Sequence, residues 1–78
     1  MSSVRAEIDR LGMVGYEFAK RIGMSEHRLN RLLKGRVKNV TDDDVARIAG
    51  GLKQPAGPVR AELERRAREH REELGRTA

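Results

Sequence analysis

The sequence predicts a small all-α domain of five helices. Apolar residues recur at spacings of three and four along most of the chain, which is the period of an amphipathic helix. Glycines and helix-capping residues separate these segments at the points where helices would end and begin. With 78 residues, the chain suffices for one domain with a modest core.

The first two helices are expected over residues 3–11 and 16–22. Gly12 ends the first, and Gly23 stands where a left-handed residue would stop the second. The inward faces are Val4, Ile8 and Leu11 in the first helix and Phe18, Ala19 and Ile22 in the second.

The third helix is expected over residues 26–34. Ser25 is a suitable N-cap, and Gly35 ends the helix. The residues that face inward are Leu29, Leu32 and Leu33.

The fourth helix follows the polar connection RVKNV. Thr41 and Asp44 have the spacing of a capping box, and three successive aspartates suit the positive end of a helix dipole. The core face comprises Val45, Ile48, Ala49 and Leu52, and Gly50-Gly51 is expected to fray the end of the helix.

A fifth helix is expected from Pro58 to about residue 74, after the short linker QPAGP and before Gly75. Its apolar stripe is thin, and its charges form pairs at i,i+4: Glu62/Arg66, Glu64/Arg68, Arg65/Glu69 and Arg68/Glu72. The helix therefore packs on the domain through Val59 and Leu63, or it pairs with another chain. We divide the chain into a domain over residues 1–54 and a linker with a charged helix over residues 55–78, a possible dimerisation element.

The net charge of +5 is concentrated in one segment. Residues 15–38 hold seven basic and two acidic side chains, a net of +5, whereas the six arginines and five glutamates after residue 58 almost cancel. A local basic excess is typical of a polyanion site, although a solvated basic surface gives the same pattern.

Two short helices joined by Gly23, Met24 and Ser25 must cross at a steep angle. Ala19 supplies the small residue that a close crossing needs. The polar and basic residues on the outer face of the third helix are Glu26, His27, Asn30, Arg31 and Lys34.

This arrangement resembles the helix-turn-helix of the Cro and lambda-repressor type, the bacterial and phage family often called XRE-like. The motif maps onto residues 15–34, with Ala19 at its small position and Gly23 at its turn. The segment VARIAGGL is similar to the helix that closes the family's five-helix domain, so the resemblance covers roughly residues 4–52. The chain departs from the family where Val14 and Gly15 replace a common Thr-Gln, whose glutamine contacts a phosphate.

The resemblance implies that the third helix enters the major groove of double-stranded DNA. Arginine matches the two acceptors of guanine and asparagine the edge of adenine. We therefore expect base contacts from Glu26, His27, Asn30 and Arg31. We expect phosphate contacts from Tyr16, Lys20, Ser25, Arg28, Lys34, Arg36 and Lys38. Ser25 also serves as a cap, and Arg28 faces the DNA backbone, a partner or solvent.

The implied function is that of a small transcriptional repressor, bacterial or phage-encoded, which binds a palindromic operator as a homodimer. The rival hypothesis is a protein-interaction module, such as an antitoxin-like partner or an inhibitor of transcription machinery, that docks through the fifth helix. No nucleophile lies beside a base and the two histidines are far apart, so we expect no enzyme, cofactor or metal. We expect a cytoplasmic, nucleoid-associated protein with no small-molecule ligand and no membrane contact, since no apolar run could cross a bilayer.

Overall fold

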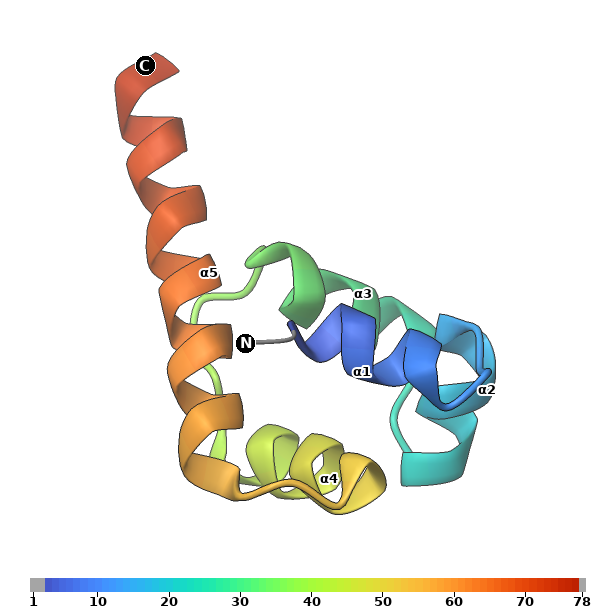
Figure 1. The fold of residues 1–78 in the computed structure, drawn as a ribbon. Helices are drawn as coiled ribbons and strands as arrows, with labels where there is room; N and C mark the ends of the chain where they lie inside the picture. Colours follow the sequence, from blue (N-terminus) through green and yellow to red (C-terminus); the bar gives the residue numbers. More distant parts are fainter. Residues whose placement is uncertain (1–2, 78) are drawn as a thin grey trace.

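The computed structural model describes residues 3–77, and in that range the protein is all-helical (Figure 1). The five helices are α1 (Val4–Arg10), α2 (Gly15–Ile22), α3 (Glu26–Lys34), α4 (Asp42–Leu52) and α5 (Ala56–Thr77). The first four helices and the beginning of α5 form one body, and the far end of α5 extends beyond it (Figure 1). The predicted all-α fold with a helix-turn-helix at α2 and α3 is confirmed.

Local capping defines the helix ends as predicted. The Ser25 hydroxyl oxygen accepts a hydrogen bond from the Arg28 amide at 3.1 Å, and the Thr41 hydroxyl oxygen accepts one from the Asp44 amide at the same distance. Gly23 and Gly35 have φ of 73° and 75°, and the amide that follows each one bonds back to a carbonyl five residues earlier. These are Schellman ends, which satisfy carbonyl groups that the helix leaves open.

The end of α4 differs from the prediction. The helix continues through Gly50 and Gly51 to Leu52 instead of fraying. A Cβ on Gly51 would lie 2.5 Å from Cγ2 of Ile22 and 2.9 Å from Cζ of Phe18. Gly51 therefore lets α4 approach α2 closely, and this packing outweighs the low helix propensity of glycine, about 1 kcal/mol.

The bounds of α5 also differ from the prediction, because it begins at Ala56 and includes Gly75. Pro58 is the third residue of the helix, where a missing N–H costs no intrahelical hydrogen bond. The helix is about 33 Å long at 1.5 Å per residue. None of the helices within residues 3–77 is both long and apolar enough to cross a membrane.

The first half of α5 belongs to the core. Val59, Leu63 and Ala67 are buried together with apolar residues of the other four helices, and Leu63 is fully buried. Of the two options left open by the sequence, α5 thus packs on the domain. Val59 and Leu63 are therefore not available for contact with another chain, while Leu74 is 56% exposed.

Two of the four predicted ion pairs on α5 form, Glu62–Arg66 and Arg65–Glu69. Glu64 pairs with Arg60 and not with Arg68. The predicted pair of Arg68 with Glu72 is also absent among the described residues. Glu62 has a second role, since its two carboxylate oxygens accept the Val4 amide at 2.8 and 3.0 Å. The start of α1 is thereby tied to α5.

Candidate nucleic-acid interface

The α2–α3 turn is held by a residue that the sequence analysis did not single out. Nη1 of Arg47, on α4, donates to the Ile22 carbonyl at 2.9 Å, and Nε of Arg47 pairs with Asp43 at 2.8 Å. A Cβ on Gly23 would lie 2.8 Å from the same Nη1. Gly23 therefore supplies both the left-handed turn and the space for this contact. The only sequence signal for Arg47 is its i,i+4 spacing from Asp43.

The outer face of α3 carries the residues predicted for base contact. Buried leucines hold the opposite face in the core, and the exposed positions are Glu26, His27, Arg31 and Lys34. Asn30 and Arg28 are partly buried and lie on the two flanks of this face. A helix with such a face can enter a major groove without disturbing its own packing.

Asn30 lies beside the start of α2. A Cβ placed on Gly15 would be 3.8 Å from Oδ1 of Asn30 and 3.5 Å from Nη1 of Arg5. The structure thus brings one predicted base-contact residue next to the first turn of α2, whose open amide groups favour anions. Arg5 is an exposed cation of α1 that the sequence analysis missed, and no local pattern marks it.

Two predicted phosphate contacts on α2, Tyr16 and Lys20, are also exposed, and Tyr16 is 58% exposed. Tyr16 stands in the first turn of α2, one residue after Gly15. The Val14 amide donates to the Glu17 carboxylate at 3.2 Å, the bond that the third helical residue makes back to the N-cap in a capping box, whereas Val14 has no side-chain oxygen to cap α2.

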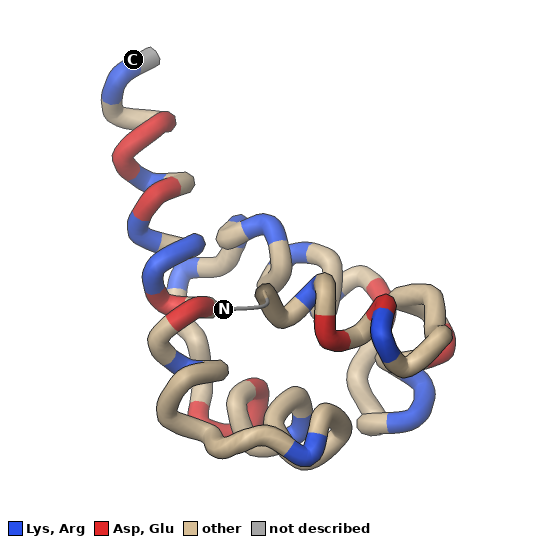
Figure 2. The backbone as a smooth tube through the Cα atoms, viewed as in Figure 1, with Lys and Arg blue, Asp and Glu red and all other residues tan. Residues whose placement is uncertain are grey.

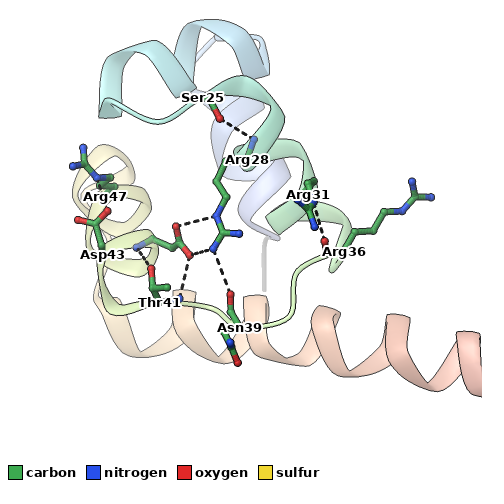
Figure 3. Close-up of polar contacts among 9 residues, drawn as sticks. Ser25, Arg28, Arg31, Arg36, Asn39, Thr41, Asp43 and Arg47 are labelled. Carbon is green, nitrogen blue, oxygen red and sulfur yellow. Dashed lines mark hydrogen bonds and ion pairs between the residues drawn. The ribbon is translucent and has the colours of Figure 1, made fainter.

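Arg28 on α3 reaches to the start of α4 (Figure 3). Its Nη2 lies 2.6 Å from Oδ2 of Asp44, its Nε lies 3.4 Å from Oδ1, and Nη2 also donates to the Asn39 carbonyl at 3.4 Å. Asp44 is the single buried charged residue within the described range. Arg28 was expected to face DNA, a partner or solvent, but in this structure it is part of an ion pair between α3 and α4.

The pKa of Asp44 is lowered from its ordinary value of 3.8. Burial alone would raise this pKa because it disfavours the charged form. Hydrogen bonds from Arg28 and Thr41 outweigh burial and stabilise the carboxylate. Asp44 therefore remains charged in the folded state at neutral pH and fixes the flank of α3 to the cap of α4.

Arg31 lies one turn after Arg28, at the end of α3 that adjoins α5. Its Nε donates to the Arg36 carbonyl at 3.0 Å, so in the free protein its side chain lies along the end of α3 (Figure 3). Figure 3 also shows the Arg36 side chain pointing away from the body.

The loop after α3 alternates between buried and exposed residues. Gly35 and Val37 are buried, while Arg36 and Lys38 are exposed. A Cβ on Gly35 would overlap the backbone carbonyl of Arg66, so α5 rests directly on this glycine. The loop is thus anchored at two positions and directs two cations outward. Figure 2 shows Lys and Arg positions in α3 and the loop after it, and in α5.

A family model, the Cro/C1-type HTH DNA-binding domain, matches residues 7–53. No curated protein and no solved structure matches the chain. The match covers α2, α3 and α4 with most of α1, and it ends before α5 begins. Over more than half of its length, and with the capped helices and left-handed turn described above, the chain belongs to the Cro/C1-type helix-turn-helix family of DNA-binding domains.

Proposed function

We propose that the protein is a sequence-specific transcriptional repressor that binds a palindromic DNA operator as a dimer. The observation that supports this proposal most is the outer face of α3, where exposed hydrogen-bonding and basic side chains stand opposite a fully buried leucine face. In this family of folds such a helix enters the major groove, while the preceding helix crosses the DNA backbone.

Asn30 and Arg31 are the proposed base readers. Asparagine can bond to both N6 and N7 of adenine, and arginine to O6 and N7 of guanine. Arg31 must leave the Arg36 carbonyl to do so, a change confined to one exposed side chain. His27 and Glu26 stand one turn earlier, where histidine can donate to a base and glutamate can accept from the amino group of cytosine.

Phosphate contacts are proposed for a ring of residues around that face. They are Tyr16, Lys20, Ser25, Lys34, Arg36 and Lys38, together with Arg5. Arg28 is left out of this set because its guanidinium already neutralises Asp44. Its proposed role is to hold α3 at a fixed angle to α4.

Dimerisation is proposed on grounds of affinity. One recognition helix reads only a few base pairs, whereas two helices one turn of DNA apart, about 34 Å, read a palindrome. Because Val59 and Leu63 are buried within the domain, an apolar contact between two α5 helices would use Leu74, which is 56% exposed. Sedimentation with and without the operator measures this proposal directly.

The test of sequence specificity is a selection of bound duplexes from a random pool. We expect enrichment of a two-fold symmetric sequence. Arg31→Ala should then weaken binding to the selected duplex by about 1–3 kcal/mol and relax preference at one base pair. Lys38→Gln is the matched control, since loss of a phosphate contact should weaken selected and random DNA equally and lower the salt slope by about one.

Two outcomes would contradict the proposal. Equal losses on both duplexes for Arg31→Ala would make Arg31 a phosphate contact. Failure to enrich any sequence, with no salt-dependent binding, would favour the protein-interaction module, in which the projecting end of α5 is the docking surface (Figure 1).

A further inference from the structure

Two adjoining grooves lie between the loop after α3 and the second half of α5. The larger, of about 280 Å³, includes Lys38, Arg68 and Arg71 in its lining. The other, of about 230 Å³, includes Arg36, Lys38 and Arg71. Lys38 and Arg71 line both grooves, so the two form one continuous strip along α5, which we call the α5 strip.

The cations of the α5 strip have no acidic partners among residues 3–77. Arg36, Lys38, Arg68 and Arg71 are all exposed, and the described residues form no ion pair with any of them. The three other arginines in the first half of α5 are each paired with an acid: Arg60 with Asp42 and Glu64, Arg65 with Glu69, and Arg66 with Glu62. Glu64 lines the larger groove, but its carboxylate is bound to Arg60.

Like charges gathered in this way repel one another, and an anion bound between them removes that repulsion. Guanidinium groups match the geometry of phosphate oxygens and bind them in a bidentate manner. The smaller groove also has an apolar part, since Leu74 lines it and is 56% exposed, whereas Val37 is only 5% exposed. Lys38 and Arg71 line both grooves and Leu74 lines only the smaller one, so the feature that continues along the whole strip is positive charge, which favours a phosphate backbone.

The α5 strip is also continuous with the end of α3. Arg31, a proposed base reader, lines the smaller groove together with Arg71 and His70. A DNA duplex whose major groove holds α3 would place a backbone strand close to this end of the helix.

We infer that Arg68 and Arg71, acting with Arg36 and Lys38, form a second contact with the DNA phosphate backbone, beside the groove that α3 enters. This inference rests on the proposed function. It gives the second half of α5 a role other than core packing, since none of residues 68–76 is buried. The added contacts are with phosphates, so they strengthen binding to any sequence alike.

The test compares two double variants of the full chain, Arg68→Gln/Arg71→Gln and the control Arg65→Gln/Arg76→Gln. Both remove two positive charges from exposed positions of α5. Binding to the selected duplex and to a random duplex is measured between 50 and 200 mM salt, and thermal melting verifies that each variant folds. Loss of two phosphate contacts should lower the slope of log K against log[salt] by about two. Between 50 and 200 mM salt, the factor by which affinity falls should therefore be about tenfold smaller for the first variant than for the parent protein.

We expect Arg68→Gln/Arg71→Gln to weaken both duplexes by the same factor with an unchanged base preference, and the control to bind like the parent. Parental affinity and slope for Arg68→Gln/Arg71→Gln would overturn the inference while leaving the proposed function intact. A loss of affinity with an unchanged slope, together with a monomer by sedimentation, would also overturn it and assign the strip to a second copy of the chain. Absence of DNA binding by the parent protein would instead refute the proposed function.

Discussion

The basic residues where α3 meets α4 differ in role from those where it meets α5. On the flank toward α4, Arg28 is bound to the buried carboxylate of Asp44 and to a loop carbonyl. On the flank toward α5, the contact is made by backbone packing at Gly35, and the nearby cations Arg36 and Lys38 remain exposed. On the first flank, the charge of Arg28 holds the helix in place. On the second, the charges of Arg36 and Lys38 are available to bind a polyanion.

This difference separates residues that position the recognition helix from residues that can bind DNA. A basic residue counts toward a DNA surface only if no internal acid neutralises it, as Asp44 neutralises Arg28. Charge alone would have grouped Arg28 with Lys38. The following four experiments test the comparison, in order of decreasing expected effect.

Gly35→Ala should have the largest effect. Its φ of 75° costs a side chain about 1–2 kcal/mol, and overlap with the Arg66 carbonyl adds about 1–3 kcal/mol of overpacking. Gly12→Ala is the matched control, because Gly12 has the same φ but open space around it. Urea unfolding of both variants measures the difference. Equal losses would show that α5 does not rest on Gly35.

Asp44→Asn should destabilise the protein by about 1–3 kcal/mol, because it leaves Arg28 without its carboxylate in a partly buried position. The control is Asp43→Asn, which breaks the exposed pair with Arg47 and should cost less than about 1 kcal/mol. If both variants unfold at the same urea concentration, the ion pair between Arg28 and Asp44 does not hold α3 against α4.

The contribution of Asp44 should depend on pH. Its pKa is lower in the folded state than its ordinary value of 3.8, so its stabilising effect is complete above that value and is lost as the pH falls through the folded pKa. The difference in unfolding free energy between the parent protein and Asp44→Asn should therefore shrink below pH 3.8. A difference that stays constant down to pH 2 would show that the lost stability does not come from the carboxylate charge.

Lys38→Gln should have the smallest effect on stability, within about 0.5 kcal/mol, because its ammonium group has no internal partner among the described residues. A small gain in stability would agree with the loss of repulsion between Lys38 and the neighbouring cations. A loss above about 1 kcal/mol would mean that Lys38 supports the fold, and the contrast between the two flanks would fail.

Local signals in the sequence were sufficient for the ends of α2 and α3. Ser25, Gly23 and Gly35 act through their own backbone and neighbouring amides, so their roles follow from residue type and spacing. The all-α fold and the helix-turn-helix followed from the same signals.

Features that depend on distant packing did not follow from the sequence. Gly51 looked like a helix breaker because its contact with Phe18 and Ile22 arises only when α4 meets α2. Arg28 has Asp44 as a partner 16 residues away, and no helical spacing connects them. Glu64 can pair with Arg60 or with Arg68 at equal spacing, and the choice between the two is made in three dimensions.

The hydrogen bond between the Glu62 carboxylate of α5 and the Val4 amide of α1 has a consequence for the order in which the protein folds. A helix of seven residues cannot persist alone in water, and the first amide of α1 finds its acceptor 58 residues further along the chain. α1 should thus become ordered only when α5 docks, although α1 is synthesised before α5. Deuterium uptake at the Val4 amide would therefore report the docking of α5, because each separation of the two helices exposes that single N–H to solvent.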